Sequence, residues 1–153
     1  MPLATSRPSP QLLVGAPLGR VHWLDLPAER PSVGASRSAV GNWLRGWRLP
    51  EESCEDAVLI VSELATNVIG HTNSERFLCC VGLTAGNLIH LEVHDHGTVA
   101  GQLLPVSAGP DDEGGRGLLL VEHLSEQWGV RRSLLTYGSV VWARLPEGRA
   151  ALG

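Results

Sequence analysis

The most constraining feature of this 153-residue chain is a strict alternation of apolar and polar residues near its middle. Successive side chains of a β-strand point to opposite faces, so the alternation predicts a strand with one apolar face and one solvent-exposed face. Helices are therefore expected on a single side of the sheet, in a two-layer α/β (α+β) sandwich. The two sets of alternate positions are Ile89, Leu91, Val93 and Asp95 on one face, and His90, Glu92, His94 and His96 on the other.

Shorter periodic stretches predict the remaining elements. Short turns join several of the strands, so we expect one mixed, mostly antiparallel sheet. Helical spacing recurs in three segments, which would form the second layer. The predicted strands are 20–26, 75–83, 89–95, 127–132 and 139–145, and the predicted helices are 32–47, 51–71 and a segment that begins near Gly115.

Composition excludes several classes of function. The net charge is −4 and the densest basic cluster is Arg131-Arg132, which disfavours nucleic-acid binding. Apolar runs are too short to span a membrane, and the first residues do not resemble a secretion signal. The three cysteines, of which Cys79 and Cys80 are adjacent, do not form a disulfide framework. A cytoplasmic location is therefore expected.

The length predicts a single domain over residues 19–148. Residues 1–18 are rich in Pro, Ser and Ala and are expected to form a disordered leader, and residues 149–153 a frayed tail. Segment 98–114 has no periodicity and ends in an acidic, glycine-containing stretch. A loop of this length inside a small domain is typical of either a functional lid or a disordered segment.

The predicted helix 51–71 carries a polar row beside its apolar stripe. Glu63, Asn67 and His71 follow one another at intervals of four, so the first two lie ~6 Å apart along the axis. A carboxylate that accepts a proton next to an amide oxygen that ligates a hard cation suits a site where a metal-bound phosphate meets a general base. The alternative is a solvated polar face.

Two further motifs carry possible chemistry. The segment Gly115-Arg116-Gly117-Leu118 enters a helix, where backbone N–H groups favour an anion. Asp95-His96-Gly97 places a carboxylate on the buried side of a strand end, and the exocyclic amine of a nucleobase is one candidate partner for it. A tight turn before a helix and a turn aspartate are the respective alternatives.

A third motif points to another chemistry. His94 and His96, with Glu92 on the same predicted face, resemble a two-histidine metal arm. No third ligand cluster lies nearby in the sequence. A metal-dependent hydrolase is therefore kept only as an outlying alternative.

Taken in order, the motifs resemble the GHKL ATPase family, the Bergerat nucleotide-binding fold of gyrase, sensor histidine kinases and anti-sigma factor kinases. Segments 61–64, 114–121 and 128–130 look like the short actinobacterial anti-sigma-factor type. The resemblance covers about residues 20–146 and implies a Bergerat fold with ATP and Mg²⁺ as cofactors.

The resemblance also implies roles for individual residues. Glu63 would be the base that polarises the hydroxyl or water attacking the γ-phosphate, and Asn67 would hold Mg²⁺ on the phosphates. Asp95 would bond the adenine amine, Gly97 would make room beside the base, and Ser139 would keep a hydroxyl near the adenine.

The glycine-rich segment is assigned in the same way. Gly115 and Gly117 would let the backbone wrap the phosphates, together with the N–H of Leu118. Because no Lys lies in segment 98–114, the γ-phosphate charge would rest on Arg116 or on Mg²⁺.

The implied function is a serine/threonine protein kinase that phosphorylates a small antagonist (anti-anti-sigma) protein and so releases or captures a sigma factor. Val68 stands where Ala is usual in the family, and the lid lacks Lys. These departures motivate the alternative of an ATP-dependent binding module that captures a partner without phosphoryl transfer. The resemblance and the five Trp also suggest a homodimer, with Trp43 and Trp47 as the anchor pair.

Overall fold

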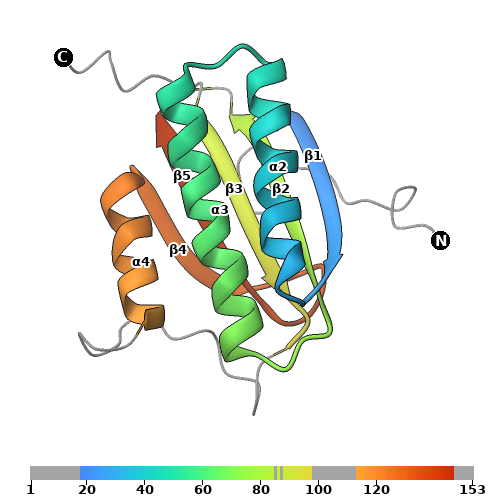
Figure 1. Ribbon diagram of the computed structural model, residues 1–153. Helices are drawn as coiled ribbons and strands as arrows, with labels where there is room; N and C mark the ends of the chain where they lie inside the picture. The colour runs from blue at the N-terminus through green and yellow to red at the C-terminus, as the bar shows by residue number, and fades with distance from the viewer. Residues whose placement is uncertain (1–17, 85, 87, 98–112, 147–153) are drawn as a thin grey trace.

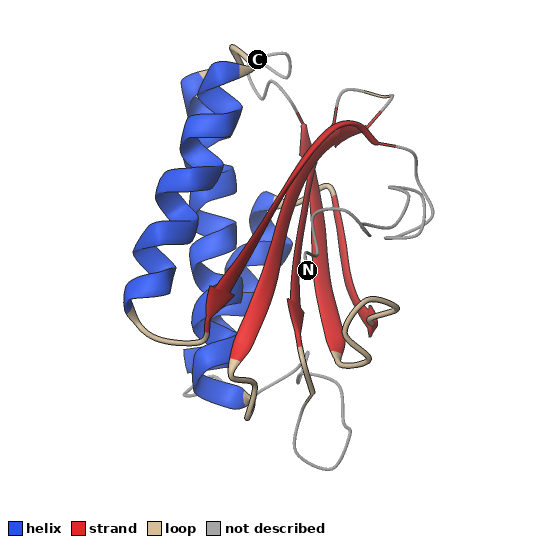
Figure 2. Cartoon of the chain, turned by 90° about the vertical axis from the view of Figure 1, so that its right-hand side faces the viewer, coloured by secondary structure: helices blue, strands red, loops and turns tan. Residues whose placement is uncertain are grey.

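The two predicted layers are both present in the computed structural model, which describes residues 18–84, 86, 88–97 and 113–146. Figure 1 shows the helices in front of the sheet, and Figure 2 shows them all on one side of it. In chain order the elements are β1 (Leu18–Pro27), α2 (Pro31–Gly46), α3 (Glu51–His71), β2 (Arg76–Thr84), β3 (Leu88–Asp95), α4 (Glu113–Leu124), β4 (Gln127–Arg132) and β5 (Ser139–Pro146).

The sheet has five strands in the order β1-β2-β3-β5-β4. All four pairings are antiparallel, so the described strands include no parallel pair of the kind that a mixed sheet would contain. β3 lies at the centre, and β5 pairs with it although α4 and β4 lie between the two strands in the chain. The expected two-layer α+β sandwich is confirmed. The predicted leader, tail and most of the predicted lid lie outside the described residues.

The hydrophobic core lies between α3 and the sheet. The apolar stripe of α3 is buried, including Ala57, Val61 and Leu64, against the predicted inner face of β3. Each fully buried aliphatic side chain contributes roughly 1.5–3 kcal/mol. This packing fixes the rotation of α3, and therefore the direction of its polar row.

Trp43 and Trp47 of α2 both stack on His22 of β1. Their ring centroids lie 4.5 Å and 5.5 Å from the imidazole centroid, with interplanar angles of 10° and 19°. Both tryptophans also pack against the core and are half-buried. The pair therefore holds α2 on β1 within one chain, and a role in a dimer interface stays a prediction.

The face of β3 opposite the helices differs from the sequence prediction. His90, Glu92 and His94 are at most 1% exposed, so the prediction of a solvent-exposed face is wrong here. The Glu92 carboxylate accepts hydrogen bonds from Nε2 of His90 at 2.7 Å and from Nε2 of His94 at 2.6 Å. Polar groups that satisfy one another can be buried, and alternation reports two chemically different faces rather than exposure.

The structure does not support the metal-arm alternative. Both ring nitrogens of His94 are engaged, Nε2 by Glu92 and Nδ1 by the hydroxyl of Ser133 at 2.7 Å. His96 is exposed and follows the end of β3. Across the described part of the chain, no group of three or more His, Cys, Asp or Glu is placed to hold a metal ion.

None of the three cysteines forms a disulfide, and all three are buried. Burial raises the pKa of the Cys79 thiol to about 12, which leaves this thiol unreactive at neutral pH. None of the helices in the described ranges is long and apolar enough to cross a membrane.

The buried Glu92 predicts how stability depends on pH. Burial raises the pKa of this carboxyl, but the hydrogen bonds from His90 and His94 outweigh burial, and the pKa lies below its ordinary value. A depressed pKa gives stability that is fully present above the unfolded-state pKa of about 4.3 and is lost as the pH falls through the folded-state pKa. Glu92→Gln should therefore lower the free energy of unfolding at pH 7 by about 1.5–3 kcal/mol and flatten its loss in acid.

Urea titrations between neutral and acidic pH measure both effects. Glu122→Gln, on the exposed side of α4, is the control and should follow wild type. Equal acid sensitivity in wild type and Glu92→Gln would contradict the role assigned to this carboxylate.

Candidate functional site

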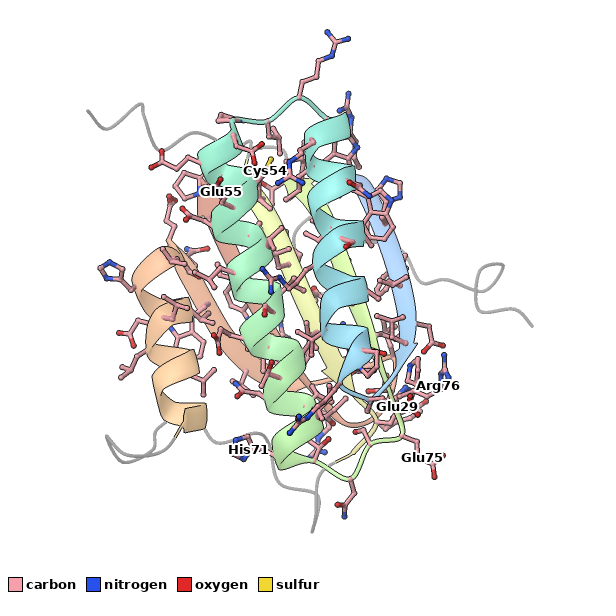
Figure 3. All side chains as sticks on the ribbon, in the orientation of Figure 1. Glu29, Cys54, Glu55, His71, Glu75 and Arg76 are labelled. Atoms are coloured by element: carbon pink, nitrogen blue, oxygen red, sulfur yellow. The ribbon has the colours of Figure 1, made fainter. Side chains whose placement is uncertain are left out.

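The predicted site segments meet at one end of the molecule. α3 ends at His71, β3 ends at Asp95, α4 begins at Glu113 and β5 begins at Ser139. In Figure 1 these four ends lie together at the lower end, where Figure 3 labels His71. The sheet pairing confirms part of this placement, since His94 is paired with Val140 and the next residues, Asp95 and Ser139, are in contact.

Asp95 is fully buried, and its two carboxylate oxygens differ in their surroundings. Oδ1 accepts hydrogen bonds from the backbone N–H of Gly97 at 2.8 Å and of Ser139 at 3.0 Å. Oδ2 is buried and has no hydrogen-bond partner among the described residues. An unsatisfied buried acceptor costs about 1–3 kcal/mol, more when it is charged, so Oδ2 is set to accept a hydrogen bond from a ligand.

Ser139 adds a second unsatisfied group beside this carboxylate. Its hydroxyl is buried, and no described residue forms a hydrogen bond with it. Ser139 lies in register with Val141 and Ala143, which face the helices, and Asp95 lies in register with the helix-facing residues of β3. The two side chains are therefore on the same, helix-facing side of the sheet.

Glycines on two sides let the backbone come close to Asp95. At Gly138, a Cβ would collide with the carbonyl and carboxylate oxygens of Asp95 and with the N–H of Gly97. Gly97 itself has φ +144°, a conformation that favours glycine, and the space a Cβ would enter there is open. Gly97 also borders an open cavity of about 460 Å³, whose wall includes Arg76, at the end where Figure 3 labels that residue.

The two predicted α3 residues differ in exposure. Asn67 is 6% exposed, and none of the hydrogen bonds among described residues engages its side chain. Glu63 is half-buried and His71 is exposed. The alternative of a solvated polar face is therefore wrong at Asn67, whose buried amide has donors and an acceptor to offer a ligand.

The glycine-rich segment lies at the start of α4. Gly115, Arg116 and Gly117 fall within the helix Glu113–Leu124, at the same end of the molecule as Asp95. The side chain of Leu118 is 4% exposed and belongs to the core, and its N–H, at the sixth position of α4, lies within the i→i−4 hydrogen bonding of the helix.

Several residues that shape the site were not found from the sequence. The hydroxyl of Thr136 donates to the carbonyl oxygen of Asp95, and Gly138 allows the close approach described above. Ser74 accepts a hydrogen bond from the N–H of His96 at 2.9 Å and donates to the carbonyl oxygen of Gly97 at 3.2 Å. The hydrogen bonds among these contacts join positions 22 to 41 residues apart, and no local sequence pattern indicates them.

The chain matches known proteins at the level of a family and a fold. Residues 26–145 match the family model of the histidine kinase-like ATPase domain. No curated protein matches the chain.

Three solved structures illustrate the fold. The RsbU and RsbW domains of a Mycobacterium tuberculosis protein align with a TM-score of 0.64 and 15% identity, over 84% of this chain and 32% of that chain. A blue-light activated histidine kinase from Erythrobacter litoralis aligns with a TM-score of 0.55 and 19% identity, over 79% of this chain and 43% of that chain. A chain of the SiaB–SiaC complex from Pseudomonas aeruginosa aligns with a TM-score of 0.60 and 11% identity, over 95% of this chain and 98% of that chain. The chain thus spans less than half of the first two structures and nearly all of the third.

Gly138 offers a test of the Asp95 geometry. Gly138→Ala should lower the free energy of unfolding by about 1–3 kcal/mol, because the added methyl group meets backbone atoms and a buried carboxylate that have little room to move. Gly34→Ala is the matched control, since Gly34 is exposed within α2 with open space around it. This substitution should raise the free energy of unfolding by about 0.5–1 kcal/mol. Chemical denaturation measures both, and an unchanged stability in Gly138→Ala would contradict the described contact.

Proposed function

The chain belongs to the family of histidine kinase-like ATPase domains, and we propose that it is an ATP-dependent serine/threonine protein kinase of the anti-sigma type. ATP binding follows from the family. The phosphorylated residue type, Mg²⁺, the partner proteins, a possible homodimer and a cytoplasmic location are parts of the proposal.

The observation that carries the proposal is the unpartnered Oδ2 of Asp95. Adenine presents an exocyclic amine, a hydrogen-bond donor, at the position where guanine presents an oxygen acceptor. A carboxylate oxygen bonds the former and repels the latter. The open space at Gly97 and the free hydroxyl of Ser139 support a purine base beside this carboxylate.

The phosphates would lie between α3 and the start of α4. Asn67 would hold Mg²⁺ through its amide oxygen, and the free backbone N–H groups at the start of α4, including that of Gly115, would face the phosphate oxygens. The bound cation supplies charge neutralisation on the phosphates when it is present. Glu63 lies one turn before Asn67 and is half-buried, and it would be the base that takes the proton of an incoming hydroxyl.

A protein partner is the second part of the proposal. The similar structures include an RsbW domain and a chain crystallised as the SiaB–SiaC complex, which supports a small antagonist protein as the substrate and a sigma factor as the second partner. The alternative function is a binding module that captures its partner without phosphoryl transfer. It is favoured by Val68, buried next to Asn67, and by the absence of Lys from segment 98–114.

Asp95→Asn tests nucleotide recognition. Asn keeps an oxygen for the N–H groups of Gly97 and Ser139, but it places an amide donor where Oδ2 would meet the adenine amine. Affinity for ATP should fall about tenfold to a hundredfold, because the variant loses one charge-assisted hydrogen bond to the base. Isothermal titration calorimetry measures the change.

The control is Glu55→Gln, which removes a carboxylate from the exposed, opposite end of α3, where Figure 3 labels it. Its affinity for ATP should equal that of wild type. A folded Asp95→Asn protein with wild-type affinity would remove Asp95 from the nucleotide site.

Glu63→Gln separates the kinase from the binding module. A base acts on the incoming hydroxyl and not on bound ATP, so this variant should keep its ATP affinity and lose at least about a hundredfold in transfer to the antagonist protein. Asn67→Ala should lose Mg²⁺-dependent affinity as well. Transfer is measured with radiolabelled ATP and a partner identified by ATP-dependent pull-down.

The two functions predict different results. If wild type captures the partner in an ATP-dependent manner and transfers no phosphate to it, and Glu63→Gln captures it equally well, the binding module is correct. Phosphoryl transfer at the wild-type rate by Glu63→Gln would show that another residue is the base.

A further inference from the structure

A continuous chain of hydrogen bonds joins the buried glutamate on one face of the sheet to Asp95 on the other. Glu92 accepts from Nε2 of His94 at 2.6 Å, and Nδ1 of His94 lies 2.7 Å from the hydroxyl of Ser133. Ser133 begins the connection 133–138 between β4 and β5, which we call the β4–β5 turn. The same turn contacts Asp95 through Thr136 and Gly138.

The protons in this chain can be assigned. The hydroxyl oxygen of Ser133 accepts hydrogen bonds from the backbone N–H of Leu135 at 3.1 Å and of Thr136 at 3.0 Å. These two bonds use both acceptor positions of the oxygen, so its proton is donated to Nδ1 of His94. His94 then carries its own proton on Nε2 and donates it to Glu92. Glu92 therefore fixes the orientation of the imidazole, which in turn fixes the hydroxyl.

Further bonds make Ser133 the anchor of the turn. Its backbone N–H donates to the carbonyl oxygen of Gly138 at 2.8 Å, and its carbonyl oxygen accepts from the N–H of Tyr137 at 3.1 Å. The hydroxyl of Thr136 accepts from the N–H of Gly138 at 3.1 Å. Ser133 and Thr136 thus supply most of the described bonds that shape the turn, and a long bond from Nη1 of Arg132 to the carbonyl oxygen of Tyr137, at 3.5 Å, adds to them.

The turn also contains a strained residue. Tyr137 has φ +65°, a left-handed conformation that non-glycine residues rarely adopt, and the residue is 81% exposed. Such a conformation persists only where surrounding contacts impose it. The bonds to Ser133 on one side and to Asp95 on the other are the contacts in place here.

We propose that His94, braced by Glu92, is a positioning residue for nucleobase recognition. Through Ser133 it holds the β4–β5 turn in the conformation that places the N–H of Ser139 on Asp95 Oδ1 and leaves Oδ2 free for the adenine amine. The face of the sheet turned away from the helices thereby sets the preference for adenine over guanine. This inference rests on the proposed function of Asp95.

His90 provides a matched control on the same carboxylate. It is as buried as His94 and donates to the other oxygen of Glu92. Its Nδ1 accepts from Nε of Arg144 at 3.0 Å, and its ring stacks near Trp142. None of its described contacts reaches the β4–β5 turn, so its loss removes an equivalent buried imidazole without releasing the turn.

The test measures ATP and GTP affinity by calorimetry for wild type and four variants. Ser133→Ala and His94→Gln remove the bond between Ser133 and His94, and both should lower ATP affinity about tenfold, with a smaller ratio of ATP to GTP affinity. His94→Asn places an amide oxygen near the position of Nδ1, so its ratio of ATP to GTP affinity should lie closer to that of wild type than the ratio of His94→Gln does. His90→Gln should retain the wild-type ratio.

The outcomes are distinct. Circular dichroism establishes folding, and if His94→Gln does not fold, Ser133→Ala decides, since it removes a single oxygen. An unchanged ratio in folded Ser133→Ala overturns the inference, and so does an equal loss in His90→Gln. Wild-type protein that binds no adenine nucleotide overturns the proposed function and this inference together, whereas wild-type binding with unaffected variants overturns only the inference.

Discussion

The carboxylate of Asp95 is buried, with one oxygen held by two backbone N–H groups and the other oxygen unpartnered. Burying such a group is costly unless donors surround it, and the fold supplies them from two directions. Antiparallel pairing brings the start of β5 beside the end of β3, and the turn after β3 brings back the N–H of Gly97. Gly138 is required because the β4–β5 turn passes too close to the carboxylate for any side chain. The local architecture is therefore arranged so that one acceptor stays free.

α3 joins this site to the core. Its apolar stripe is buried against the sheet, which is why the adjacent polar row has a fixed direction. The packing that buries Val68 also buries Asn67. The neutral amide of Asn67 is therefore shielded from water, which it would not be on a solvated helix face. The core and the candidate phosphate site consequently share one helix, and a change in its rotation would disturb both.

The periodicity of the sequence predicted the elements well, because burial on one side leaves a period of two or of 3.6 residues. β4 was predicted with its observed bounds, and the inner face of β3 was predicted correctly up to Asp95. The outer face was predicted wrongly, since the same alternation is produced by exposed polar residues and by buried ones that bond each other. Thr136 and Gly138 were missed because their partner, Asp95, lies about forty residues earlier in the chain.

The position of two neighbouring residues on β3 explains how the β4–β5 turn is held. Side chains of adjacent residues in a strand point to opposite faces, so Asp95 faces the helices and His94 faces away from them. His94 bonds Ser133, the first residue of the turn, and Asp95 contacts Thr136 and Gly138 at its far end. The β4–β5 turn is thus held by contacts to both faces of a single strand. Two contacts to one rigid strand restrict the turn more than two contacts to separate elements would. In the proposed arrangement, this restriction holds Tyr137 in its left-handed conformation and leaves Oδ2 of Asp95 free for a ligand.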